Sequence, residues 1–271
     1  PFSDSTGNWS GNMDWIGKAL ECLPIHGRNC TARQLDAAQR HDQNVEIVAT
    51  DPPYYDNIGY SDLADFFYVW LRSGLREVYP SVFSTLLTPK TLQLVATPYR
   101  FDGDAAAANK HFELGLHRAF TNMRRIMHNQ YPLTVYYAFK QSEAQKDNED
   151  FNRDAISSTG WETMLEGLIQ AGFTINGTWP MRTERPTGVK VAVNALASSI
   201  VLVCRPRPDD APTTDRRGLI AALHDELPDA LRKLQQGTIA PVDLPQAAIG
   251  PGMAVFSRYA KVIENDGTTM T

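Results

Sequence analysis

The feature that most constrains this chain is a β-branched run, Val45 to Thr50, that ends abruptly at Asp51, Pro52 and Pro53. Valine, isoleucine and threonine favour extended backbone, so the run predicts a buried strand over 45–50. Proline has no N–H group to donate to a strand ladder, so the strand must stop there. The sequence therefore places an acidic side chain at the carboxyl end of a strand.

The chain from 1 to 205 alternates between helical and extended patterns. We expect helices over 9–23, 61–76 and 104–128, and a fourth helix that begins at a capping box at 159–162 and ends near Gly172. Residues 80–103 are expected to form a loop. Strands are expected over 28–33, 133–139, 173–182 and 197–205. Helical crossovers predict that the strands over 45–50, 133–139 and 173–182 are parallel, and the last strand, reached through a loop, is expected to be antiparallel. The aromatic stripe Phe66, Phe67 and Trp70 is interpreted as core. The fold class is α/β, with a partial Rossmann-like sheet.

The character of the sequence changes near residue 206. A proline-rich link covers 206–212, and a leucine stripe over 219–234 predicts a helix that packs on the sheet domain, with Pro228 as a candidate break. Beyond residue 237 the pattern is loop-like, including 249–253. We therefore expect an α/β domain over 1–205 and a helical and loop appendage over 206–271.

Composition narrows the class of protein. Hydrophobic residues make up 42% and charged residues 21%, as in a soluble globular protein. No apolar run approaches the roughly 18 residues of a membrane span, and no signal peptide opens the chain. The three cysteines, Cys22, Cys30 and Cys204, are far apart, which favours a reducing compartment and predicts a cytoplasmic protein. Cys22, His26 and Cys30 do not have the spacing of a zinc site, so no metal is expected.

The net charge of −5 argues against a uniformly basic nucleic-acid surface. The net charge does not determine where charges lie on the surface, so one face of an acidic protein can still be basic. The loop from 182 to 194 follows a predicted strand and should open on the same edge of the sheet as Asp51. Its basic residues Arg182, Arg185 and Lys190 are candidates to contact DNA phosphates.

The motif from Asp51 to Tyr54 has the parts that methylation of a base amine needs. Such an amine is a poor nucleophile because its lone pair is delocalised into the ring. A carboxylate from Asp51 and the Pro52 carbonyl would accept its two hydrogens, Pro53 stiffens the turn, and the Tyr54 ring offers a stacking surface for an extruded base. The alternative is that an aspartate before proline is ordinary turn chemistry at a strand end.

Three neighbouring residues are candidates for the same base pocket. Tyr55 and Tyr60 would line it with aromatic surface, although aromatic residues beside an aromatic helix are as often part of the core. Asn57 would reach the base edge, or it would cap a turn instead.

The motif and the residues after it resemble a known family. Asp51 to Tyr54 is similar to the fourth motif of the amino-methyltransferases that modify adenine or cytosine in DNA. The longer stretches 51–58 and 60–72 resemble the large adenine-specific DNA methylases of bacteria and archaea, which carry an amino-terminal domain of unknown function and a zinc ribbon. Further stretches similar to that group are 179–184, 194–200 and 250–253.

The resemblance implies an S-adenosylmethionine-dependent enzyme with a Rossmann-like methyltransferase sheet that acts on DNA. Asp36 would match the family's third motif, whose acidic residue approaches the adenine ring of the cofactor; the alternative is a solvated helix or turn residue. The family's glycine-rich cofactor loop and zinc ribbon have no counterpart in this sequence, and the chain begins with Pro1. We therefore expect a carboxy-terminal fragment with an incomplete cofactor site, whose partner is the missing amino-terminal part of the same protein.

Other functions remain open at this stage. The same amine chemistry serves methylation of RNA, or of cytosine or guanine. The chain would alternatively be a binding module that holds nucleic acid or protein without turnover.

Overall fold

The computed structural model describes Ser5 and residues 7–23, 33–39, 44–45, 47–55, 58–137, 153–182, 198–236 and 244–270. The chain divides into two compact units, Pro1–Leu35 and Asp36–Thr271. The first unit contains α1 (Trp9–Glu21), which begins where the Asn8 side chain accepts a hydrogen bond from the backbone N–H of Gly11 at 2.8 Å. This confirms the helix predicted over 9–23. The strand predicted over 28–33 lies, except for its last residue, outside the described residues.

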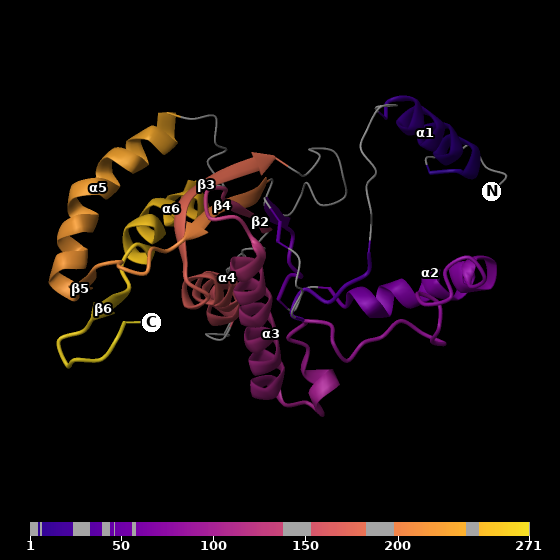
Figure 1. The fold of residues 1–271 in the computed structure, drawn as a ribbon, viewed down its shortest axis with the longest axis horizontal. Coiled ribbons are helices and arrows are strands. Elements are labelled where there is room, and N and C mark those ends of the chain that lie inside the picture. Colours follow the sequence, from indigo (N-terminus) through magenta and orange to yellow (C-terminus); the bar gives the residue numbers. More distant parts are fainter. Residues whose placement is uncertain are drawn as a thin grey trace. The chain divides into compact units, whose positions relative to one another are not determined.

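The second unit contains a four-stranded mixed sheet in the order β1-β2-β4-β3. Figure 1 shows β2, β4 and β3 of this sheet together. β1 (Val48–Thr50) pairs parallel with β2 (Leu133–Tyr137), while β4 (Ser198–Pro206) pairs antiparallel with both β2 and β3 (Phe173–Arg182). β1, β2 and β3 therefore point the same way, and the prediction that the last strand is antiparallel is confirmed. β4 lies between β2 and β3, so those two strands do not pair directly. The mixed α/β class is confirmed at this level.

The main core lies where helices cover one face of the sheet. α3 (Ala105–Ile126) and α4 (Arg153–Gln170) pack against each other and against the strands. Their fully buried side chains, with those of the strands, include Phe112, Leu116, Phe120, Met164, Leu168, Leu133, Val135, Phe173, Ile175, Ile200 and Leu202. By alternation and strand register, Tyr136 and Trp179 share the other face, where both side chains are exposed.

The carboxy-terminal elements belong to the same compact unit as the sheet. α6 (Leu244–Ser257) packs along β3, and at the bulge in that strand the backbone N–H of Ile175 donates to Ser257 Oγ at 2.8 Å. A second small cluster joins α6 to α5 (Arg216–Gln236) through Leu219, Val255 and Val262. Beside it, β5 (Thr213–Asp215) and β6 (Lys261–Ile263) form a parallel pair.

Three predicted local features are wrong. α4 begins at Arg153, so the capping box at 159–162 lies inside a helix. There Gly160 allows close packing, because an added Cβ would lie 3.1 Å from Tyr55 Cβ. Residues 249–253 are helical, not loop, and α5 continues through Pro228. Packing of α6 on β3 outweighs the weak helix propensity of its glycines and Pro251.

α2 (Tyr60–Leu75) confirms the helix predicted over 61–76. An irregular segment follows it and includes the 3-10 turn η1 (Pro98–Phe101), as expected for 80–103 apart from that turn. The interpretation of Phe66, Phe67 and Trp70 as core is wrong, because all three side chains are exposed. An amphipathic pattern identifies the apolar side of a helix and does not show what that side faces.

Candidate functional site

Asp51 lies at the carboxyl edge of the sheet, directly after β1. The strands that share its direction end at Tyr137 and Arg182, and register places those ends on the same edge as Thr50. Ligands of α/β sheets bind beyond the carboxyl ends of parallel strands. The motif therefore occupies the position that the sequence predicted, next to the parallel pair β1 and β2.

The motif lines a pocket of about 490 Å³ together with two residues that follow it. All four motif residues take part, and the remaining wall comes from Ile58 and Tyr60. Pro52 is buried whereas Asp51 is accessible to solvent, so the prolines are fixed in the fold and the carboxylate faces the open side. The volume lies within the roughly 300–1,000 Å³ of small-molecule sites.

The electrostatics of Asp51 suit a hydrogen-bond acceptor. Partial burial raises the pKa of the Asp51 carboxyl above its ordinary value, because desolvation disfavours the charged form. A carboxylate of higher pKa is a stronger acceptor. Within the part of the chain that the structure describes, no side-chain hydrogen bond or ion pair occupies this carboxylate.

Contacts between aromatic rings fix the position of Tyr54. Its ring meets the ring of Tyr137 edge to face, with centroids 5.6 Å apart. Tyr137 is buried, its hydroxyl donates to the carbonyl of Gly160 at 3.4 Å, and its ring centroid lies 5.8 Å from that of Trp161. The half-buried Tyr54 ring is therefore supported from the core while it lines the pocket.

Tyr55 lies in the core and does not line the pocket, although it was a candidate for it. Its hydroxyl donates to Asn109 Oδ1 at 2.5 Å, and its ring packs edge to face on Phe112 with centroids 5.2 Å apart. Its carbonyl accepts from the backbone N–H of Ala96 at 2.9 Å. Tyr55 thus anchors the motif to α3 and to the segment before η1.

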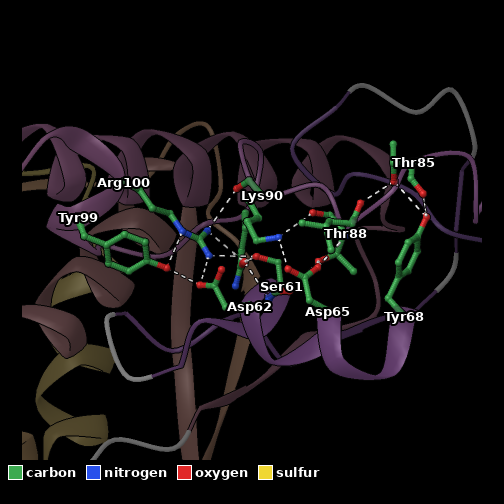
Figure 2. A network of polar contacts seen from close by, with 11 residues as sticks. Ser61, Asp62, Asp65, Tyr68, Thr85, Thr88, Lys90, Tyr99 and Arg100 are labelled. Atoms are coloured by element: carbon green, nitrogen blue, oxygen red, sulfur yellow. Dashed lines mark hydrogen bonds and ion pairs between the residues drawn. The ribbon is translucent and has the colours of Figure 1, made fainter. Parts of the chain in front are cut away.

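Tyr60, the first residue of α2, lines the pocket. A polar network that includes Ser61, Asp62 and Arg100 holds this end of the helix (Figure 2). Gly59 at the N-cap has no side chain to satisfy the first backbone N–H groups. The Gln93 side chain supplies the cap instead. Its Oε1 accepts hydrogen bonds from the backbone N–H of Ser61 at 3.0 Å and from the Ser61 hydroxyl. Arg100 Nη1 donates to the same Oε1 at 3.2 Å. A residue 32 positions downstream therefore caps α2.

Arg100 connects this cap to the acidic first turn of α2. Its Nη2 donates to Ser61 Oγ at 3.0 Å and to Asp62 Oδ2 at 2.7 Å, and Asp62 also accepts from Tyr99. Hydrogen bonds from Tyr99 and then Arg100 lower the pKa of Asp62. The pocket wall at Ile58 and Tyr60 is thus tied to η1 by charge-assisted bonds.

Sequence reasoning missed Ile58, Gln93 and Arg100. Ile58 carries no polar atom to attract notice, although it belongs to the stretch that resembles the methylase family. Gln93 and Arg100 lie in a segment without periodicity, and only the fold brings them to the start of α2. The unsupported glycine before α2 was the available signal, since a helix end needs a cap from elsewhere.

The other predicted site residues divide into two groups. Asp36 makes a turn: its Oδ1 accepts from the backbone N–H of Ala38 at 2.9 Å, and its predicted role at the cofactor stays a prediction. Asn57, Arg185 and Lys190 lie outside the described residues, and of Arg182 only the backbone is described, at the end of β3.

The described residues do not form a complete cradle for S-adenosylmethionine. In the methylases that residues 51–72 resemble, this cradle is a glycine-rich turn between a strand and a helix. The described glycine between β1 and α2 is Gly59, where an added Cβ would meet Asp62 Oδ2 at 2.7 Å. At this position the space beside the glycine is taken up by a side chain in the first turn of α2.

Among the described residues, no group of three or more histidine, cysteine or acidic side chains is arranged to hold a metal ion. No helix in the described ranges is both long and apolar enough to cross a membrane. No protein-family model matches the chain, and neither a curated protein nor a solved structure matches it.

Proposed function

We propose that this chain is the base-binding, catalytic part of a DNA amino-methyltransferase that modifies the exocyclic amine of adenine. One observation carries the proposal: the Asp-Pro-Pro-Tyr motif lines a pocket at the carboxyl end of a parallel strand. The similarity of residues 51–72 to the adenine-specific methylases supports the same conclusion.

The residues of the pocket divide the work on an extruded adenine. Asp51 accepts one amine hydrogen, and the Pro52 carbonyl accepts the other. Localising the lone pair on nitrogen in this way makes the amine a nucleophile without a covalent enzyme intermediate. The raised pKa of Asp51 strengthens its acceptor role. Tyr54, supported by Tyr137, stacks on the ring in place of the lost base-stacking partners.

The walls of the pocket favour a flat heteroaromatic ligand. Tyr54 and Tyr60 bring two aromatic side chains to the same cavity, and Ile58 adds an apolar surface. Aromatic rings bind the faces of bases, whereas hydrogen-bonding groups read their edges. Asp51 supplies the edge contact.

The methyl donor and the DNA require more than the pocket. S-adenosylmethionine supplies the electrophilic methyl group when bound. We propose that an additional amino-terminal part of a longer protein binds it. The backbone of Arg182 ends β3 on the edge where Asp51 lies, which is consistent with phosphate contacts from that loop. The protein is expected to act in the cytoplasm.

The test is methyl transfer by the longer protein that contains this chain. Labelled S-adenosylmethionine is supplied with separate pools of DNA and RNA, and the label is traced to the modified nucleoside. We expect N6-methyladenine in DNA. Asp51→Ala should abolish transfer without unfolding the protein, while Asp225→Ala, which removes an exposed carboxylate of α5, should leave it unchanged.

Three results would contradict the proposal. Label in RNA, cytosine or guanine alone would assign a different substrate. Full activity of Asp51→Ala would show that the motif is a turn. Absence of transfer, with unaltered DNA binding, would identify a binding module. Titration of S-adenosylmethionine into this chain and into the longer protein separately tests the cofactor assignment, and binding is expected only in the longer form.

A further inference from the structure

The inner face of α2 is polar, which is the reverse of the usual arrangement for a helix on a protein surface. Ser61, Asp65, Tyr68 and Arg72 recur at helical spacing and form the side that faces the segment 80–101. Asp65 Oδ2 accepts from Lys90 at 2.6 Å, and the Tyr68 hydroxyl donates to the carbonyl of Thr85 at 2.9 Å (Figure 2). Hydrogen bonds and ion pairs, together with the ring contact of Tyr68, therefore hold α2 in place.

The opposite side of α2 is apolar and exposed. Leu63, Phe66, Phe67 and Trp70 are 64%, 69%, 63% and 71% exposed. They recur at intervals of three, four and seven residues, the spacing of a helix face made for packing. Gly74 continues this side, and nothing lies within 4 Å of a Cβ added there. We call Leu63, Phe66, Phe67, Trp70, Leu71 and Gly74 the outer face of α2.

The outer face is large enough to be an interface. A buried aromatic side chain covers about 150–250 Å², so three aromatics that are two-thirds exposed present roughly 300–500 Å². Leu63 and the half-exposed Leu71 enlarge this apolar area. The total approaches the roughly 800 Å² that each partner contributes to a standard interface, and aromatic residues are enriched in such interfaces.

We propose that the outer face of α2 pairs with the same face of a second copy, with the two helices antiparallel about a two-fold axis. A two-fold interface must be self-complementary, because each contact occurs twice. An axis between residues 68 and 69 satisfies this requirement. It sets Phe67 opposite Trp70 of the second copy, Phe66 opposite Leu71, and Leu63 opposite the space beside Gly74.

The helix dipole supports the antiparallel direction, because this arrangement sets the opposite ends of the two dipoles side by side. A parallel arrangement would set like ends together. Nucleic acid is a poorer occupant, because α2 presents an uninterrupted apolar stripe instead of the basic groove with interleaved aromatics that binds a strand.

The first test is the oligomeric state of the chain by sedimentation equilibrium over a concentration series. We expect a reversible dimer. Phe67→Glu and Trp70→Glu should each weaken it by roughly thirtyfold or more, the size expected for a central interface residue. Leu114→Glu, a matched change at an exposed leucine of α3, should leave the dimer intact. Circular dichroism checks that every variant is folded.

The second test is direct and reads the direction of the helices. Chains carrying Leu63→Cys are mixed with chains carrying Gly74→Cys and oxidised. Disulfide-linked pairs between the two variants are expected, with little linkage of either variant to itself beyond that of the wild type. A monomeric wild-type chain, a dimer unaffected by Phe67→Glu, or self-linkage of Leu63→Cys would each overturn the proposal. None of these results depends on whether the chain takes part in methylation.

Discussion

Replacement of Gly250 by alanine tests how α6 is attached to the sheet. Gly250 is buried against β3, where an added Cβ would lie 2.7 Å from Thr178 Cβ and closer still to both of its γ atoms. Rotation of the Thr178 side chain does not remove the clash. Its Cβ does not move, and in every staggered rotamer at least one of its two γ heavy atoms occupies one of the two positions that face the added Cβ. The helix must therefore shift away from β3.

The magnitude follows from two opposing terms. Overpacking a well-filled site costs about 1–3 kcal/mol, and replacing a helical glycine by alanine returns up to about 1 kcal/mol. We expect a net loss of about 1–2 kcal/mol in the free energy of unfolding, or roughly 2–6 °C in Tm for a chain of this size. Gly252→Ala is the control, since nothing lies within 4 Å of its added Cβ; it should stabilise the protein slightly.

Urea denaturation of the two variants measures the difference. A double-mutant cycle with Thr178→Ala identifies the contact, because Gly250→Ala should cost much less when Thr178 is already shortened. Two outcomes would contradict this prediction: Gly250→Ala is as stable as Gly252→Ala, or the effect of Gly250→Ala is the same in both Thr178 backgrounds. Either result would mean that α6 does not pack on β3 through this glycine.

Two further predictions concern titratable groups. Hydrogen bonds from Lys90 and Thr88 lower the pKa of Asp65 to about 2. The ionised Asp65 therefore stabilises the folded state at any pH above its ordinary pKa of about 3.9, and this stabilisation is lost as the pH falls towards 2. Asp65→Asn should therefore lower the urea midpoint at pH 7 and have little effect near pH 2; an equal effect at both values would contradict this assignment. Burial raises the pKa of Cys204 to about 12, whereas Cys22 is exposed. Iodoacetamide at pH 8 should modify Cys22 in the native protein and Cys204 only in denaturant, as read by peptide mass spectrometry, and rapid native labelling of Cys204 would show that β4 is not buried as described.

The elements that local chemistry determines could be predicted from the sequence. The β-branched run before Asp51 and Pro52 predicts a strand that ends at the motif, and the structure places Asp51 directly after β1. Helical spacing predicts α3, where Asp104 caps the first turn, and the crossovers predict the shared direction of β1, β2 and β3.

Features that depend on tertiary contacts could not be predicted. Residues 249–253 have poor helix propensity, and their helix forms where Gly250 fits against Thr178. The apolar side of α2 was assigned to the core because sequence does not reveal that the polar side is held by Lys90 and Arg100. The same limit applies to the pocket: the motif is visible in the sequence, and the contribution of Tyr60 instead of Tyr55 is decided by packing.

Asp51 is proposed to orient a base amine in the pocket, and the rate of a single turnover is the sharpest test of this role. The protein, in the longer form proposed above, is loaded with labelled S-adenosylmethionine and mixed with excess DNA, and N6-methyladenine is quantified over time for the wild type and Asp51→Ala. Loss of one preorganised hydrogen-bonding group at a reacting centre typically slows chemistry by roughly 10²–10³-fold, and we expect a decrease of this size with unchanged DNA affinity. A single-turnover rate within a few-fold of the wild type would contradict the claim.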